Sequence, residues 1–102
     1  PLEFLVRKQT KETAETFGLM DRGQIKEGYL ADINIIDHEN LCVYKPEMVH
    51  DLPTGSRRII QKAGGYIATI KSGVVTFKDD QATGELPGTV LRGERKLESL
   101  SA

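Results

Sequence analysis

Short apolar runs separated by glycine fill the chain from residue 23 onward, and this pattern limits the fold to small strands joined by tight turns. Residues 66–71 and 74–78 are the clearest pair, because both are rich in β-branched groups and the dipeptide Ser72-Gly73 lies between them. Two residues of this kind form the turn of a hairpin. We therefore predict an antiparallel hairpin over residues 66–78.

A further strand is predicted directly after Asp32, where residues 33–36 read Ile-Asn-Ile-Ile. Side chains alternate across a strand, so Ile33 and Ile35 lie on one face and Ile36 lies on the other. Apolar groups on both faces favour a strand inside a sandwich.

A helix is predicted over residues 2–17, because apolar residues that include Leu5 and Val6 recur at helical spacing near its start. The apolar stripe fades after Val6. We expect either two short helices that meet near Thr10 or one frayed helix. Gly18 suits the left-handed position that closes a helix.

The segments between these elements read mainly as turns and loops. Residues 37–40 are turn-like, and residues 41–53 are expected to form an extended loop because Pro46 and Pro53 oppose a central strand. A possible strand spans residues 58–62.

After that strand, the dipeptide Gly64-Gly65 offers a turn. Residues 81–93 read as loop with a short extended stretch at residues 90–91, and residues 94–102 read as a frayed polar tail.

The expected fold class is mainly β with an N-terminal helix: a partial β-sandwich of four or five short antiparallel strands. We divide the chain into three predicted segments: a terminal helix over residues 1–19, a β-domain over residues 20–93 and a flexible tail over residues 94–102.

Composition describes an ordinary globular domain and excludes several partners. The chain has 102 residues and a formal net charge of −1, so it carries no excess of basic residues for nucleic acid. Its apolar runs are far shorter than the ~20 residues of a membrane span. The single Cys42 has no partner for an internal disulfide, and we expect a cytoplasmic protein. Because the chain begins at Pro1 and enters a helix at once, we expect a truncated piece of a longer protein.

Residues 23–37 carry the pattern G-x-I-x-x-G-x-x-A-D-I-x-I-x-D, which resembles the amidohydrolase superfamily. The motif has a structural explanation. Gly28 permits a turn, the small Ala31 accepts close packing, and Asp32 can accept hydrogen bonds from backbone amides at the entry to a strand. We interpret Asp32 as a structural residue rather than an acid or base.

Two later segments resemble the N-acyl-D-amino-acid deacylases within that superfamily. Residues 51–58 contain D-L-P-x-G, and residues 83–93 read T-G-x-L-P-G-x-x-L-R-G. In this order, with the hairpin between them, the three segments cover residues 23–93. Relatives often have proline-alanine where this chain has Thr13-Ala14, which bears on the local helix break.

The resemblance implies a parent enzyme with a (β/α)8-type barrel and a smaller β-domain composed of both chain ends. This chain would be the last barrel helix and the C-terminal share of that domain, with its own barrel as partner. In such enzymes a divalent metal, usually zinc, activates water, and an aspartate near the end of the barrel handles the proton. The parent would be a hydrolase of non-peptide C–N bonds, with its zinc ligands upstream of Pro1.

No catalytic, cofactor-binding or metal-binding residue is predicted in the chain itself. Its imidazole and thiol groups, His38, Cys42 and His50, show no H-x-H or C-x-x-C spacing, so we interpret them as loop histidines and a packed cysteine. For Arg57 and Arg58 we favour docking against the barrel over contact with a substrate carboxylate.

Neither a nucleophilic serine nor a phosphate-binding loop is predicted, because the residues around the candidates lack the required spacing. Ser56 and Ser72 do not lie in a G-x-S-x-G elbow, and Gly64-Gly65 lacks the lysine and spacing of a phosphate loop.

Two other functions remain open from the sequence: an autonomous small β-domain for binding or oligomerisation, and a minimal enzyme. If strands of the β-domain are supplied from elsewhere, this chain exposes unpaired strand edges and apolar faces. We therefore expect the isolated chain to form homo-oligomers.

Overall fold

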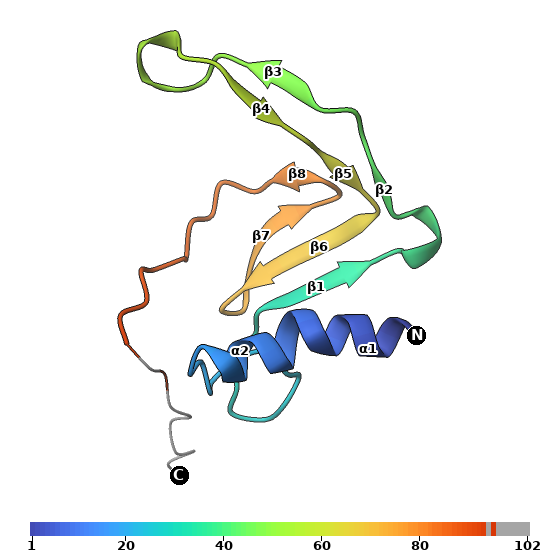
Figure 1. Cartoon of the computed structure of the whole chain (residues 1–102), viewed down its shortest axis with the longest axis vertical. Helices are drawn as coiled ribbons and strands as arrows, with labels where there is room; N and C mark the ends of the chain where they lie inside the picture. The colour runs from blue at the N-terminus through green and yellow to red at the C-terminus, as the bar shows by residue number, and fades with distance from the viewer. Residues whose placement is uncertain (94, 96–102) are drawn as a thin grey trace.

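The computed structural model describes residues 1–93 and 95, and begins with one continuous helix (Figure 1). It consists of α1 (Leu2–Arg7), a π-helical turn (Lys8–Glu12) and α2 (Thr13–Thr16). The Thr13 hydroxyl donates to the Lys8 carbonyl, five residues back, at 2.6 Å. The predicted weak point near Thr10 is therefore a widened turn inside one helix, not a break.

Gly18 ends the helix as predicted, with φ of 72°. The Leu19 N–H donates to the Ala14 carbonyl at 2.8 Å and the Gly18 N–H donates to the Glu15 carbonyl at 3.1 Å. These two bonds form a Schellman motif, which satisfies carbonyls that the helix leaves unpaired.

A four-stranded antiparallel sheet follows, in the order β1-β6-β7-β8. Its strands are β1 (Ile33–Ile36), β6 (Tyr66–Lys71), β7 (Val74–Lys78) and β8 (Gln81–Ala82). The β6–β7 hairpin confirms the prediction. Its turn residues Ser72 and Gly73 have φ of 52° and 80°, and positive φ at both positions is the type I′ geometry that matches strand twist.

Two short ribbons extend from the sheet and correct the prediction for residues 41–53, which are not all loop. In the first ribbon β2 (Cys42–Val43) pairs with β5 (Ala63–Gly64), and in the second β3 (Glu47–Val49) pairs with β4 (Arg58–Ile60). We call the second ribbon and its tip, residues 47–60, the arm. Strands form here because Pro46 and Pro53 lie just outside the paired residues.

Strand β8 corrects the prediction that residues 81–93 are loop throughout. It pairs with β7 across a turn in which Asp79 and Asp80 have φ of 50° and 64°. Aspartate tolerates this region better than most residues, so a tight turn forms here without glycine. The expected extended stretch at residues 90–91 is irregular.

Of the predicted tail, Arg95 alone is described, and the prediction for residue 94 and residues 96–102 lies outside the described residues. Arg95 donates its N–H to the Gly18 carbonyl at 2.9 Å and accepts from the Met20 N–H at 2.8 Å. Within the described part of the chain, no helix is long and apolar enough to cross a membrane.

The chain exposes much more surface than a folded monomer of its size. Its accessible surface is 8481 Å², whereas a globular protein of 11.3 kDa exposes about 5,700 Å². Eight fully unfolded residues would expose only roughly 1,300 Å², so the undescribed residues cannot supply the excess. Among described apolar residues, Ala14 is the buried one, 7% exposed. The fold is thus set largely by backbone pairing rather than by a closed core.

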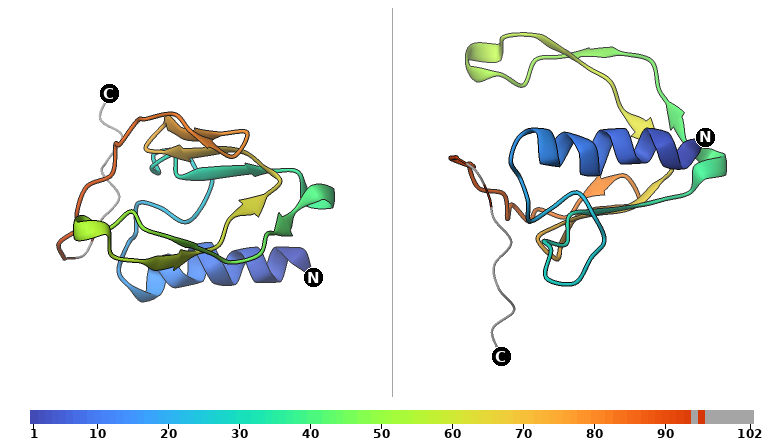
Figure 2. Two further views of the ribbon diagram at one scale, coloured as in Figure 1. Left: turned by 90° about the horizontal axis from the view of Figure 1, so that it is seen from above. Right: turned by 60° about the horizontal axis from the view of Figure 1, so that its bottom comes forward.

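Figure 2 shows how the helix, the sheet and the arm are arranged. The helix and the arm both stand on one side of the four-stranded sheet (Figure 2, left), and they lie at opposite ends of it (Figure 1). Large apolar side chains on these elements stay exposed, among them Phe4 at 54%, Ile59 at 69% and Phe77 at 46%. The molecule therefore leaves apolar side chains on the helix, the sheet and the arm exposed instead of enclosing them, and we call this exposed surface the open apolar face.

The loop after the helix packs closely against the helix at Gly23. A Cβ there would lie 2.8 Å from the Ala14 Cβ and 2.9 Å from the Thr10 carbonyl oxygen, at φ of 92°. Gly84 has nearly the same φ, 91°, and nothing lies within 4 Å of the place where its Cβ would be.

Alanine at either position is destabilised by about 1–2 kcal/mol because its backbone is in the left-handed region. Gly23→Ala adds a steric clash. We expect Gly23→Ala to lower the urea midpoint clearly more than Gly84→Ala; equal shifts would contradict the packing role.

Candidate functional site

Asp32 is the centre of a polar cluster that joins distant parts of the chain. Its carboxylate accepts two contacts from the Lys71 ammonium, at 3.0 and 2.9 Å, and one from the Ser72 N–H at 2.9 Å. Lys71 ends β6 and Ser72 begins the hairpin turn. The predicted acceptance of a backbone amide is confirmed, although that amide lies 40 residues away and not beside Asp32 in sequence.

The cluster continues through Asp21 and Arg22 to the segment after the sheet. Arg22 Nε donates to Asp21 Oδ1 at 2.9 Å, and Arg22 Nη1 lies 3.9 Å from Asp32 Oδ2. Arg95 Nε lies 3.8 Å from Asp21 Oδ2. The side chains of Asp21 and Arg22 are only 13% and 14% exposed, so these charges are shielded from solvent. We call Asp21, Arg22, Asp32, Lys71 and Arg95 the ion cluster.

The charges of the ion cluster stabilise its carboxylates in their ionised form. Burial raises the pKa of Asp32, but the Ser72 amide, Lys71 and Arg22 together outweigh it, so this pKa lies below its ordinary value. The pKa of Asp21 is also lowered, mainly by the hydrogen bond from Arg22. A carboxylate held ionised by two cations and an amide is a poor proton donor at neutral pH, which supports a structural role.

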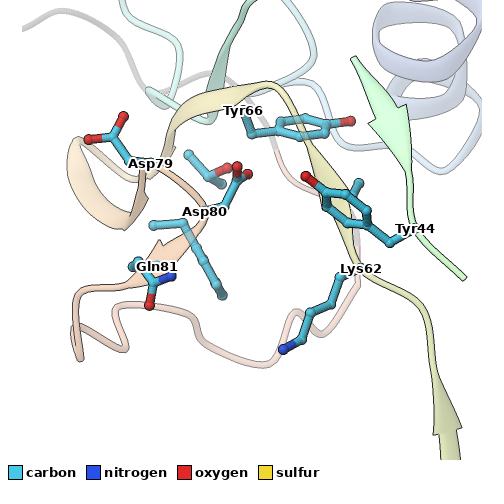
Figure 3. A pocket seen from close by; sticks show the side chains of 9 residues that line it. Tyr44, Lys62, Tyr66, Asp79, Asp80 and Gln81 are labelled. Atoms are coloured by element: carbon cyan, nitrogen blue, oxygen red, sulfur yellow. The ribbon is translucent and has the colours of Figure 1, made fainter. Parts of the chain in front are cut away.

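A second candidate site is an open cavity of about 690 Å³ between the β2–β5 ribbon and the end of the sheet. We call it the Tyr44–Asp80 cavity. Its walls include three aromatic side chains, Tyr44, Tyr66 and Phe77, and the carboxylate of Asp80. In Figure 3 the Tyr44 hydroxyl and the Asp80 carboxylate point toward one another, with the Tyr66 ring beside them.

Local backbone structure positions these groups. The Tyr44 N–H donates to the Lys62 carbonyl at 2.9 Å, which continues the pairing of the β2–β5 ribbon. A Cβ on Gly64 would lie 2.7 Å from the Tyr44 hydroxyl, so the absence of a side chain at Gly64 lets the ring lie across the ribbon. Asp80 projects from the β7–β8 turn at positive φ.

His38, Cys42 and His50 lie on separate segments. His38 begins a 3-10 helix (His38–Asn40), Cys42 begins β2, and His50 follows β3. The prediction of a packed cysteine is wrong, because Cys42 is exposed. No group of three or more His, Cys, Asp or Glu side chains suited to a metal occurs among the described residues. Zinc takes three or four converging ligands, so the residues described here do not fit the metal that the family resemblance implies.

Arg57 and Arg58 lie at the tip of the arm. Arg58 is already paired with Asp51, through Nε to Oδ1 at 2.6 Å and Nη2 to Oδ2 at 2.5 Å. Both side chains of this pair are half exposed. The hydrogen bond from Arg58 holds the pKa of Asp51 below its ordinary value. Docking of Arg57 and Arg58 against a barrel stays a prediction.

The Tyr44–Asp80 cavity was not predicted from the sequence. Tyr44 and Tyr66 lie in segments that carry no recognisable ligand spacing, and the Asp79-Asp80 pair reads as the end of a hairpin. The one available signal was the two adjacent aspartates after a strand, which fit a tight turn as well as a site.

Comparisons with known proteins place most of the chain in one family. The sequence profile described as "Amidohydrolase family" matches residues 1–77. A D-aminoacylase of Alcaligenes xylosoxydans xylosoxydans is 35% identical over 91 residues, which covers 89% of this chain and 17% of the relative. A dihydroorotase of Endomicrobium trichonymphae is 36% identical over 72 residues, which covers 70% of this chain and 17% of the relative.

The chain therefore spans about a sixth of the length of these two curated relatives. No solved structure matches it.

Substitution of Asp32 tests the structural role of the ion cluster. We expect Asp32→Asn to lower the free energy of unfolding at pH 7 by about 1–3 kcal/mol, because a half-buried cation loses its partner. Since the folded pKa is lowered, the stabilisation is present above the unfolded value of about 3.9 and is lost as pH falls through the folded value. Acid should therefore destabilise the original chain more than the variant.

Urea unfolding at pH 7 and at pH values below 4 measures both effects. The matched control is Asp51→Asn, which breaks an ion pair exposed to solvent and should change stability much less. Equal losses for the two variants would show that the Asp32 contacts are not special.

Proposed function

The chain belongs to the amidohydrolase family, and we propose that it is the C-terminal structural β-domain of a metal-dependent enzyme that hydrolyses the amide bond of N-acyl-D-amino acids. In this proposal the helix is the last of a catalytic barrel, and the strands complete a composite β-domain. The barrel and its metal ligands lie in a part of the enzyme beyond this chain. The chain by itself is inactive.

The observation that carries the proposal is the open apolar face. After allowance for the undescribed residues, the chain still exposes roughly 1,400 Å² more than a closed monomer would. A standard protein interface buries about 800 Å² on each partner. The excess is therefore large enough to be the contact surface of another domain.

The deacylase assignment is supported by motif order and coverage. The segments at residues 23–37, 51–58 and 83–93 occur in the order that the deacylases show, and the D-aminoacylase relative aligns over 89% of the chain. The position of Asp32 in a closed ion cluster agrees with a motif kept for structure. Coverage of 17% of each relative favours this proposal over an autonomous β-module.

Activity of the isolated chain gives a direct test. With a panel of N-acetyl-D-amino acids, with and without added zinc, we expect amine release no faster than the buffer background. A protein that joins this chain to an upstream barrel serves as the positive control. Turnover by the isolated chain that requires stoichiometric zinc would overturn the assignment as a structural domain.

Self-association of the isolated chain is the second expectation. Strand β1 has β6 as its one partner in the sheet and presents a free edge, where Ile35 is 45% exposed. Free edges with apolar side chains pair with further strands. Sedimentation velocity should show dimers or larger species that increase with concentration.

A lysine in the free edge should oppose this pairing. We expect Ile35→Lys to shift the population toward monomer, while Leu86→Lys, at a side chain 92% exposed and outside the strands, should have little effect. A monomer at all concentrations, or an equal effect of both variants, would count against edge pairing.

A further inference from the structure

The Tyr44–Asp80 cavity combines aromatic faces with unpaired negative charge. The exposed fractions of Tyr44, Phe77 and Tyr66 are 56%, 46% and 36%, so each ring retains surface for a ligand. Asp79 and Asp80 also line the cavity, and no ion pair among the described residues includes either one. The wall is therefore both aromatic and acidic.

The one cation of the wall, Lys62, has another partner. Its Nζ lies 3.8 Å from Glu47 Oε1, on the arm. This contact draws the lysine charge toward a carboxylate that is not part of the cavity wall. With Lys62 counted, the two aspartates still leave the wall with a net negative charge, which favours a cation over an anion.

Asp80 is close enough to the aromatic groups to act together with them. A hydrogen bond with Cys42 is the main cause that raises the pKa of Tyr44, and the negative charge of Asp80 raises it further. Figure 3 shows the carboxylate turned toward the Tyr44 hydroxyl, whereas Asp79 points away from it. A ligand group between Asp80 and the rings would meet an acceptor and a π face at once.

We propose that the Tyr44–Asp80 cavity binds a guanidinium group, from an arginine side chain of a polypeptide that packs on this face. A planar guanidinium can stack on an aromatic ring while its edge donates to a carboxylate. Its several N–H groups also match the carboxylate and hydroxyl acceptors of this wall. An ammonium is more strongly hydrated and has no flat face to stack.

This site does not depend on the proposed function, because its residues would recognise a guanidinium whichever protein supplied it. The proposal adds that the polypeptide covering the open apolar face places an arginine in the Tyr44–Asp80 cavity. Its test measures binding in the cavity and not association with a barrel. The two proposals can therefore fail separately.

Titration of the full chain, labelled with 13C in its tyrosine rings, tests the site. The probe is N-acetyl-arginine amide, and the neutral N-acetyl-citrulline amide has nearly the same shape. We expect saturable shifts at Tyr44 and Tyr66 with the arginine probe. Tyr29 lies outside the cavity, near Lys26, and should not shift.

Variants separate the charge from the rings. Asp80→Asn keeps a residue that tolerates positive φ, and it should weaken arginine binding by about tenfold. Tyr44→Leu should weaken it by several-fold through loss of stacking. Glu27→Gln removes an exposed carboxylate elsewhere and should change nothing. Circular dichroism checks that each variant keeps the fold of the original chain.

Three results would overturn the proposal. One is equal binding of the citrulline and arginine amides, and another is unchanged binding by Asp80→Asn with the fold intact. The third is equal or tighter binding of N-acetyl-lysine amide or tetramethylammonium, which would indicate a site for ammonium ligands instead. Saturable arginine binding that weakens about tenfold in Asp80→Asn and is unchanged in Glu27→Gln would support it.

Discussion

The contacts of Asp32 reinforce the junction between the entry to β1 and the β6–β7 turn, where the Gly73 N–H also donates to the Ala31 carbonyl. The carboxylate lies one residue before β1 and bonds the last residue of β6 and the first of the hairpin turn. Through Arg22 and Asp21 the same charges reach Arg95, beyond the sheet. In a molecule with almost no enclosed apolar core, such shielded charge pairs fix the register of the sheet against the loop before it. A shielded pair of this kind can specify geometry even where its net contribution to stability is small.

The open face explains why this specification is needed. Backbone pairing in short antiparallel strands leaves side chains free on both faces, and two-stranded ribbons are marginal by themselves. The helix and the arm stand apart on one side of the sheet (Figure 2), so neither covers it fully. This arrangement agrees with the proposal that another domain completes the fold. The chain belongs to the amidohydrolase family, and its match covers 17% of the length of each of the two relatives.

The Tyr44–Asp80 cavity adds a negatively charged, aromatic site to the open apolar face. Apolar faces alone accept many partners, whereas a carboxylate next to aromatic rings selects for a cation and penalises a neutral or anionic group. In the proposed composite domain, specificity would come from one charged anchor within a broad apolar contact. Such anchors concentrate binding energy near the centre of interfaces.

The sequence by itself determined the local elements: the hairpin at residues 66–78, the helix end at Gly18, the strand after Asp32 and the family motifs. Turn residues and β-branched runs encode these features within a few neighbouring positions. The sequence did not reveal strands β2, β3, β5 and β8, and its predicted turn at Gly64-Gly65 is wrong for Gly64, which lies in β5. Each of these strands is two or three residues long and is stabilised by a partner distant along the chain or by an unusual turn. It also gave no sign that Asp32 bonds an amide 40 residues away. Only the tertiary structure, which sets distances between segments far apart in the chain, could form the ion cluster, bring Tyr44 to Asp80 and leave the apolar face open.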